Sequence, residues 1–377
     1  MAGIYIHIPY CRQKCHYCNF FSGVSLKSKG DVLSSLHLEM ELRKDYLEGE
    51  QIRTIYFGGG TPSILEVSEI KAILDKIFSL FKVVENAEIT LEANPDDLTE
   101  EKLNQLKSET VINRLSVGIQ SFFGEDLRYL NRSHDGNQAI QAVKNAVKAG
   151  FLNLTLDFIF GMPTLSEKNY LENLKTAIEL GATHLSCYQL TVEPKTALDA
   201  FIRKGKVIPP PENEGIKHFY AGIKYLISKG FSHYEISNFA KSGFEAMHNT
   251  AYWKGEKYLG LGPSAHSYNG ISRSWNIPSA TEYIESLKSG IVNSETEILS
   301  KQDHYNEYIL TAIRTSKGID SEIIAARFGE NAVIEFENSI LPFLVNKKIV
   351  KNDSVYTLSY EGLIWADKIA SELFRVD

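Results

Sequence analysis

The sequence predicts an α/β protein built on a parallel sheet, followed by a smaller C-terminal α+β domain. Strand-like apolar runs alternate with amphipathic helical runs, giving six strands joined by short connections in the first half of the chain. This alternation is typical of a parallel sheet with right-handed crossovers. Six units are too few for a complete eight-stranded barrel. From about residue 305 the pattern changes to three helices followed by two strand-like runs, the order of elements in a winged helix.

The first half of the chain gives the clearest elements. Strands are expected at residues 4–8, 54–57, 87–93, 114–120, 153–160 and 183–191, and helices at 31–47, 65–81, 99–107, 137–149 and 166–180. Thr99 is the expected cap of the third helix, and Ser63 with Glu66 is the expected capping box of the second. Gly150 is expected to end the fourth helix.

The second half is less regular. Pro209–Pro211 precede a helix expected at 212–229, a strand is expected at 231–239, and residues 243–278 are predicted to form loops. The C-terminal elements are helices at 306–315, 321–328 and 333–346 and strands at 349–350 and 355–358. We therefore expect an α/β domain over 1–240, a connecting region over 241–304 and a winged-helix-like domain over 305–377. With 8 basic and 11 acidic residues, the last domain is a poor DNA binder, and we expect a lid or a docking domain.

Composition excludes several classes of protein. The chain has 377 residues, 43% of them hydrophobic, which suffices for two domains with a sizeable core. There is no apolar run of about 18 residues and no basic segment ahead of an apolar one at the N-terminus, so we expect no membrane span, no signal peptide and a cytoplasmic location. The net charge of -7 argues against a nucleic-acid partner.

Three of the four cysteines lie in one loop. The apolar run before Pro9 is expected to deliver Cys11, Cys15 and Cys18 at its end. Three soft thiolate ligands favour an iron–sulfur cluster. A closed zinc site would need a fourth ligand, and His16 leaves that alternative open. An odd number of cysteines argues against a disulfide, and Cys187, alone in an apolar run, is expected to be a buried core residue.

This cysteine spacing, with Tyr17 directly before the last cysteine, resembles the signature of the radical S-adenosylmethionine (SAM) superfamily. The resemblance implies a partial, three-quarter β/α barrel of the TIM type, open on one side. It also implies a [4Fe-4S] cluster bound at three irons by the thiolates, with the fourth iron open to the amino and carboxylate groups of SAM. Tyr5 and Tyr17 are assigned to the cofactor site on the same grounds.

A run of three glycines follows the second expected strand. By itself, Gly58–Pro62 is better explained as a tight turn into a helix with Pro62 at its first position. Glycines also allow close approach of the backbone to a ligand. In combination with the cysteine loop, the resemblance implies that Gly59, Gly60 and Thr61 contact the methionine part of SAM.

Polar residues follow several strands at the rim where α/β barrels place their chemistry. Glu92, Gln120, Arg132 and Asp157 are each weak signals, because an isolated carboxylate at a strand end is usually solvated. Together with their flanking residues they resemble the family of oxygen-independent coproporphyrinogen III oxidases and its relatives. The resemblance implies that they bind SAM, the carboxylates through hydroxyl or amino groups and the arginine through a carboxylate.

The segment His248-Asn249-Thr250-Ala251-Tyr252-Trp253 resembles the motif of a haem chaperone branch of that family. The resemblance implies haem binding, with His248 as an axial ligand and Tyr252 and Trp253 as flat apolar surface. Composition alone favours a structural histidine, and His266 is a second candidate ligand. Phe20 stands where the oxidases have a further cysteine, and only four residues precede Tyr5, where the oxidases have an N-terminal extension. Both differences argue against oxidase activity.

The function implied is that of a haem chaperone, which binds a [4Fe-4S] cluster, SAM and haem and delivers haem to client proteins, respiratory and membrane-associated ones among them. No catalytic residue is assigned, and a homodimer is one of the states allowed. One alternative is an oxygen-independent coproporphyrinogen III oxidase of porphyrin biosynthesis, in which a 5'-deoxyadenosyl radical abstracts hydrogen from a propionate. A second is an electron-transfer iron–sulfur protein, which the open fourth iron disfavours.

Overall fold

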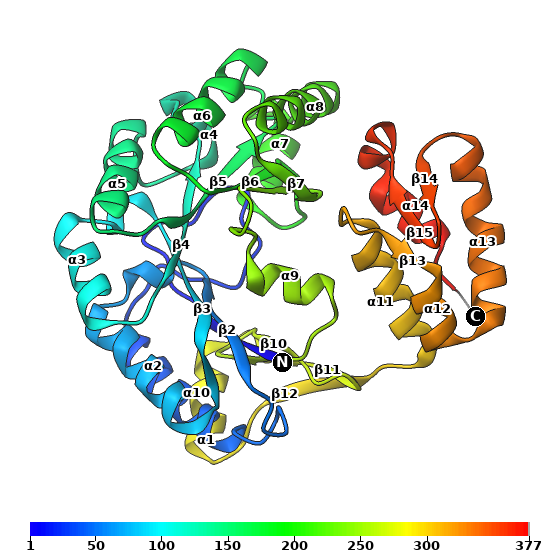
Figure 1. Ribbon diagram of the computed structural model, residues 1–377. Coiled ribbons are helices and arrows are strands. Elements are labelled where there is room, and N and C mark those ends of the chain that lie inside the picture. The colour runs from blue at the N-terminus through cyan, green and yellow to red at the C-terminus, as the bar shows by residue number, and fades with distance from the viewer. Residues whose placement is uncertain (376–377) are drawn as a thin grey trace.

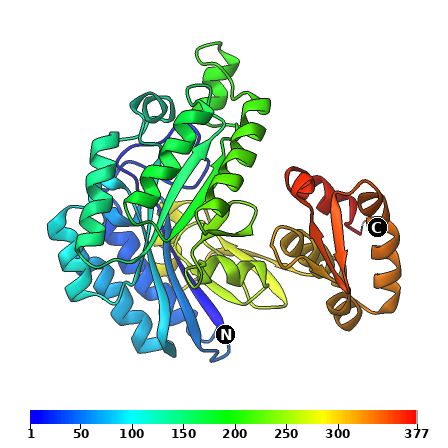
Figure 2. The ribbon, with the colours of Figure 1, turned by 45° about the horizontal axis from the view of Figure 1, so that its top comes forward.

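A computed structural model describes residues 1–375, so the last two residues of the expected C-terminal domain lie outside it. Six parallel strands lie in sequence order at the centre of one curved sheet, and helices cover its outer face (Figures 1 and 2). The strands are β1 (Ala2–Ile8), β2 (Ile52–Gly59), β3 (Val83–Ala93), β4 (Arg114–Gln120), β5 (Asn153–Phe160) and β6 (His184–Gln189). The predicted parallel α/β sheet is confirmed, as a barrel that remains open on one side.

The helices between these strands follow the predicted order. They are α1 (Lys29–Leu42), α2 (Val67–Leu80), α3 (Glu100–Glu109), α5 (Gly136–Lys148) and α6 (Glu167–Glu179). Thr99 caps α3, as expected, by accepting from the Lys102 N–H. The capping box predicted for Ser63 is wrong, because Pro62–Ile64 forms a separate 3-10 turn, η1, and Glu66 caps α2 together with Glu69.

The later part of the chain adds helices around the barrel. The prediction had no helix at α4 (Gly124–Leu130), which follows β4. Helices α7 (Ala197–Arg203) and α8 (Glu212–Ser228) follow β6, and α10 (Ala280–Lys288) packs beside α1. The strand predicted at 231–239 is instead an antiparallel pair, β7 (Ser232–Glu235) and β8 (Asn238–Ala240), on the edge of β6.

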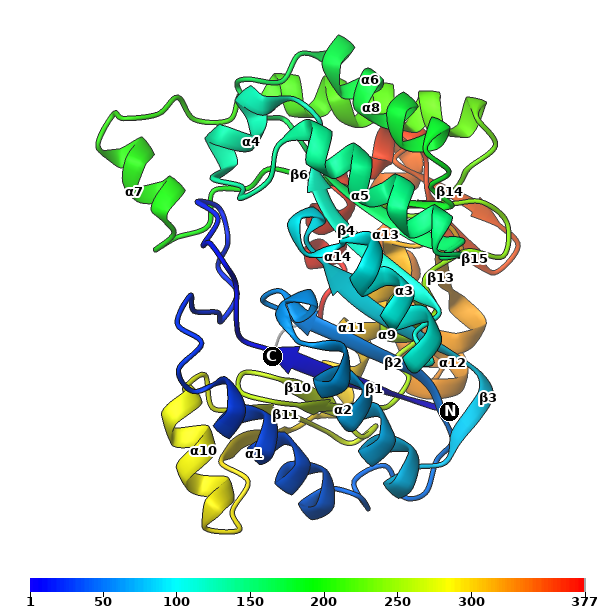
Figure 3. The same cartoon turned by 90° about the vertical axis from the view of Figure 1, so that its left-hand side faces the viewer.

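The loops predicted at 243–278 are the largest error. This region forms α9 (Met247–Trp253), β9 (Tyr258–Leu261), β10 (His266–Tyr268) and β11 (Ser272–Asn276), and β12 (Ser294–Ile298) follows. Strand β9 pairs in parallel with β1, and β10 to β12 extend the sheet in antiparallel fashion. Figure 3 shows β1 with α9, β10 and β11 nearby. The first strand of the chain is therefore an interior strand of the sheet.

The C-terminal elements have the predicted winged-helix order and a hydrophobic core of their own. They are α11 (Lys301–Ile313), β13 (Ile319–Asp320), α12 (Ser321–Phe328), α13 (Glu330–Val345), β14 (Ile349–Asn352), β15 (Val355–Leu358), η3 (Tyr360–Trp365) and α14 (Ala366–Glu372). This unit meets the barrel through backbone hydrogen bonds between residues 234–236 and 314–316. An Arg273–Glu307 ion pair of 2.6 Å also joins the C-terminal unit to the barrel. None of the helices described is long and apolar enough to cross a membrane.

Candidate functional site

The cysteine loop follows β1 and is attached to neighbouring elements on both sides. Arg12 Nε donates to Asp97 Oδ1 at 2.6 Å, and the Cys11 N–H donates to the Gly23 carbonyl at 2.9 Å. The Leu198 N–H at the start of α7 donates to the carbonyl of His16 at 2.8 Å. Figure 3 shows this loop running from the end of β1 toward α7 and α4. Cys11, Cys15 and Cys18 are free and partly exposed, whereas Cys187 is free and buried, as expected.

Two of the three loop thiols already accept hydrogen bonds. Arg132 Nη1 lies 3.2 Å from Cys15 Sγ, and Thr61 Oγ1 lies 3.4 Å from Cys11 Sγ. Such donors stabilise a thiolate, the form that binds metal. Within residues 1–375 no three Cys, His, Asp or Glu side chains are close enough together to hold a metal ion. The three thiols therefore fit a cluster, and binding of the cluster would require them to move closer together.

His16, the candidate fourth ligand of a zinc site, is engaged elsewhere. Its Nδ1 atom lies 3.1 Å from the carbonyl oxygen of Tyr129, and its ring packs edge-on against Phe201 at 5.0 Å. A closed zinc site would have to draw on the remaining ring nitrogen. The geometry therefore favours a site with three protein ligands.

The glycines at the end of β2 allow the chain to pack against β1 and the cysteine loop. A Cβ on Gly60 would lie 2.6 Å from the Tyr10 carbonyl oxygen, and one on Gly59, where φ is +103°, would lie 2.6 Å from the His7 ring. The Gly60 N–H donates to Ile8 O at 2.8 Å, and the Thr61 N–H to Tyr10 O at 2.7 Å. These residues therefore have a structural role at the base of the loop, and they also line a cavity beside the cysteines.

Two carboxyl groups face this cavity from neighbouring parts of the sheet. Glu92, near the end of β3, accepts from the Tyr56 hydroxyl at 2.7 Å, and Asp157 on β5 accepts from Ser116 Oγ at 3.1 Å. Burial raises the pKa of Glu92 to about 7 and that of Asp157 to about 6. Charge repulsion from Asp157 adds to the raised pKa of Glu92. The pair therefore lies poised between acid and carboxylate near neutral pH.

Arg132 joins the cysteine loop to the ends of β3 and β4. Its Nη2 donates to Asn94 Oδ1 at 2.6 Å and to the Gly118 carbonyl at 2.8 Å, in addition to the Cys15 contact. Its buried Nε has no partner among the described residues. An unpaired buried donor is costly, so this atom is a natural partner for an anionic group of a ligand. Gln120 ends β4 with a φ of +66° after a bulge, a strained backbone of the kind that occurs at functional sites.

These side chains line one cavity of about 500 Å³, which we call the smaller cavity. Its walls include the three loop cysteines, Tyr17, Gly59, Gly60, Thr61, Glu92, Gln120, Arg132 and Asp157. Pockets of a few hundred Å³ hold ligands of the size of a nucleoside. The structure thus brings together the predicted SAM residues, with the exception of Tyr5.

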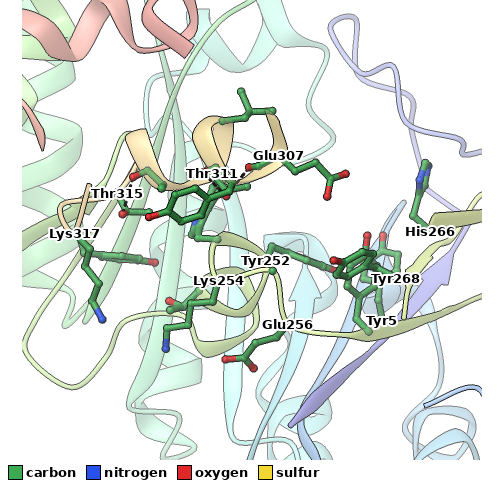
Figure 4. Close-up of a pocket in the computed structure, with 18 of the residues that line it drawn as sticks. Tyr5, Tyr252, Lys254, Glu256, His266, Tyr268, Glu307, Thr311, Thr315 and Lys317 are labelled. Carbon is green, nitrogen blue, oxygen red and sulfur yellow. Dashed lines mark hydrogen bonds between the residues drawn. The ribbon is translucent and has the colours of Figure 1, made fainter. Parts of the chain in front are cut away.

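A larger cavity of about 1150 Å³ lies between the sheet and α11 (Figure 4). Tyr5 lines this cavity, with Tyr252, Trp253 and Tyr268, and does not line the smaller one, so its assignment to the SAM site stays a prediction. Figure 4 shows Tyr5, Tyr252 and Tyr268 grouped below the helix, with Lys254 and Lys317 farther along the cavity. Phe20, in the cysteine loop, lines both the smaller and the larger cavity.

His248 is placed differently from the expected haem ligand. The residue is 2% exposed, its Nδ1 lies 2.7 Å from Thr54 Oγ1, and its Nε2 lies 2.9 Å from the Tyr252 hydroxyl. Burial lowers its pKa to about 3, so the imidazole is neutral. Because both nitrogens are engaged inside the protein, His248 presents neither of them to the larger cavity. The structure does not support an axial role in this arrangement, whereas Tyr252 and Trp253 line the cavity as expected.

Comparison with known proteins gives matches over most of the chain. Residues 5–182 match the model of the radical SAM superfamily. The chain is 33% identical over 373 residues to the "Heme chaperone HemW" of Bacillus subtilis, which covers 98% of each chain. It is 38% identical over 272 residues to the protein of the same name from Escherichia coli, which covers 70% of this chain and 69% of the relative. The chain belongs to the HemW family.

The structure is also similar to a solved structure of another radical SAM protein. The coproporphyrinogen III oxidase HemN of Escherichia coli aligns with a TM-score of 0.84, over 99% of this chain and 90% of its own. Sequence identity is only 21%, so this likeness concerns the fold alone. It supports the partial barrel and the C-terminal domain as one shared architecture.

Several residues of the smaller cavity were absent from the predicted site. Asn94 contacts Arg132, Tyr56 donates to Glu92, and Ser116 donates to Asp157. Ser116 could have been found, because it lies on β4 two residues before Gly118 and alternate residues share a face. Tyr56 precedes the glycine run by two residues, but its contact with Glu92 depends on strand register and has no local signal.

Proposed function

We propose that this protein is a haem chaperone. It would bind a [4Fe-4S] cluster through Cys11, Cys15 and Cys18, SAM in the smaller cavity and haem in the larger one, and pass haem to client proteins. When bound, the cluster and SAM supply one-electron reductive chemistry. The names of the relatives support haem as a ligand of the family, and the two cavities support separate sites for SAM and haem.

The observation on which the proposal depends is the pair of adjoining cavities with different walls. The smaller one has thiols, carboxyls and an arginine. Thiols bind the iron of a cluster, carboxyls bind the amino group of an amino-acid ligand, and an arginine binds its carboxylate. The larger one is more than twice as large and is rich in aromatic rings, which suit the flat apolar faces of a porphyrin. Phe20 lines both cavities, so a cluster and a haem would be neighbours.

Each residue of the smaller cavity has a distinct task in this proposal. Arg132 would hold the SAM carboxylate with its free Nε, while Glu92 and Asp157 would accept from its amino and hydroxyl groups. Gly59, Gly60 and Thr61 would lie along the methionine portion, and Gln120 and Tyr17 would complete the walls. The protein thus orients the cofactor and excludes water from it, with no side chain assigned to transfer a proton.

The remaining features of the proposal concern organisation and partners. Residues 1–240 would bind the cluster and SAM, 241–304 would supply the haem motif, and the domain from 305 would act as a lid or docking surface for clients. Membrane-associated respiratory proteins are the proposed clients, the cytoplasm the proposed location, and a homodimer a proposed state. Tyr252 and Trp253 would pack against haem, whereas His248 would support α9.

A transfer experiment tests the function. Cluster-loaded protein carrying one equivalent of ferric haem is mixed with membrane vesicles from haem-starved cells, with haem on serum albumin as the matched donor. We expect transfer to the vesicles to be faster from this protein than from albumin. In parallel, reduced protein is incubated with coproporphyrinogen III and SAM, and we expect no protoporphyrinogen. Steady turnover to protoporphyrinogen would identify an oxidase instead.

A further inference from the structure

Four histidines of the described chain line the larger cavity, and two of them are already engaged. His7 Nε2 lies 2.9 Å from the Phe21 carbonyl oxygen, and its Nδ1 lies 3.2 Å from the Tyr5 hydroxyl. His233 Nε2 lies 3.1 Å from the Ile236 carbonyl oxygen, and its ring stacks on Phe239 at 4.4 Å. Only the other two, His266 and His304, have rings without a hydrogen bond to the residues described.

His266 is the better placed of these two. It begins β10, is exposed, and stacks at 6.0 Å on Trp275, its cross-strand neighbour on β11. Figure 4 shows it on its strand at one end of the cavity, next to the group of Tyr5 and Tyr268. His304, by contrast, lies on α11 in the C-terminal unit. Stacking on Trp275 thus orients the His266 ring while its nitrogens stay available.

The strand that presents His266 is fixed by a buried carboxylate. Glu39 of α1 is fully buried and accepts from the Gly262 N–H at 2.8 Å and from Asn276 Nδ2 at 2.7 Å. Between these anchors the chain makes a tight turn in which Ser264 has a φ of +66°. A ligand on a rigid, anchored strand is held in position better than one on a free loop.

The chemistry of the side chain suits iron. Partial burial of the ring and the charge of Arg273 lower the pKa of His266 below its ordinary value, which favours the neutral imidazole. The neutral form is the one that coordinates metals. Histidine is also a common proximal ligand of haem iron.

We propose that His266 supplies an axial nitrogen to the iron of haem bound in the larger cavity. The inference rests on the proposed haem-binding function and assigns its ligand to β10 rather than to α9. Haem would then lie against the aromatic group of Tyr5, Tyr252 and Tyr268.

Electron paramagnetic resonance of ferric haem tests this assignment in the cluster-loaded protein, because the oxidised [4Fe-4S] cluster gives no signal. We expect His266→Ala to lose the wild-type axial-ligand signal and to bind haem more weakly, on the order of tenfold or more, since even outer-shell partners of metal ligands contribute that much. Added imidazole should restore the signal in this variant. His266→Asn should behave like His266→Ala. The same result in both variants would show that the loss comes from the missing imidazole and not from a folding defect of one variant.

The controls separate the two levels of the proposal. His304→Ala and His37→Ala, a histidine on α1, should keep the wild-type signal. If the wild type binds haem but His266→Ala keeps its signal, or His304→Ala loses it, the axial assignment is wrong and the haem function stands. If the wild type binds no haem, the proposed function and the assignment both fail.

Discussion

His248 and Tyr252 lie one turn apart on α9 and are joined by a contact of 2.9 Å between Nε2 and the phenolic oxygen. Thr54 Oγ1 on β2 lies 2.7 Å from the other ring nitrogen, and the ring stacks on Tyr56 at 4.9 Å. The backbone N–H groups of Met247 and His248 donate to the Glu88 carboxylate on β3. The His-Asn-X-X-Tyr-Trp segment therefore attaches α9 to the sheet through its histidine.

This arrangement predicts a stability defect for His248→Ala. The variant loses a buried ring and leaves polar partners unpaired, so the free energy of unfolding should fall by about 2–4 kcal/mol in urea denaturation. Tyr252→Phe removes only the hydroxyl and should cost about 1 kcal/mol. His37→Ala, which alters a partly exposed histidine, serves as the control. A His248→Ala protein as stable as the wild type that has lost the haem signal would restore the axial role to His248.

The cysteine loop predicts the composition of the metal centre. Anaerobic reconstitution should give about four irons and four sulfides per chain, as a cubane requires. Replacing Cys11, Cys15 or Cys18 with alanine should abolish this content, measured by iron and sulfide analysis. Cys187→Ala should keep it, because that thiol is buried in the core. Equal loss in a folded Cys187→Ala protein would refute the three-cysteine site.

The contacts of Arg132 predict that SAM binding in the smaller cavity requires an arginine at this position. Its two terminal nitrogens contact Cys15, Asn94 and Gly118 and its Nε is free, an arrangement that one lysine ammonium cannot reproduce. Arg132→Lys should therefore weaken SAM binding by about tenfold or more, measured by calorimetry on cluster-loaded protein. Arg128→Lys, at an exposed position of α4, is the matched control. Unchanged affinity in Arg132→Lys would place the SAM carboxylate elsewhere.

Glu92 predicts a pH-dependent contribution to stability in the protein without ligands. Its pKa is raised from 4.5 to about 7, so between these values the folded protein binds a proton that the unfolded chain has released. Stability contributed by this group is present below pH 4.5 and falls as the pH rises toward 7. Glu92→Gln cannot titrate, and its stability relative to the wild type should rise over that range by about 2–3 kcal/mol.

Urea denaturation at about pH 5 and about pH 7.5 measures this difference. Glu101→Gln, at an exposed position of α3, should show no such trend. A relative stability of Glu92→Gln that is the same at both pH values would show that Glu92 is ionised throughout.

The strands that were predicted well are those buried on both faces. β5 was predicted at 153–160, as observed, because its apolar run lies between a glycine-ended helix and a Gly-Met-Pro turn. β9 was missed because Tyr258–Leu261 is short, contains Gly260 and is followed by Gly262, and it becomes a strand by pairing with β1 and β10. β7 and β8 were merged because their turn at Ile236–Ser237 contains neither glycine nor proline.

The same distinction applies to the site. The cysteines, glycines and strand-end polar residues could be grouped from sequence because parallel strands end at the same rim of the barrel. The role of His248 could not, since its partner Thr54 is 194 residues away in sequence. Nor could the position of Tyr5, whose side chain belongs to the larger cavity because of the face of β1 that it occupies.

The pairing of β1 with β9 has a consequence for the newly made protein. One edge of β1 receives β2 early, but the other waits for Tyr258–Leu261. Until the ribosome has made those residues, the hydrogen-bonding groups of β1 on that side have no strand to pair with and can recruit other chains. Such a sequence-distant pairing also slows folding. The cysteine loop directly follows this strand, so the strand that carries the loop gains its second neighbour only after most of the chain has been made.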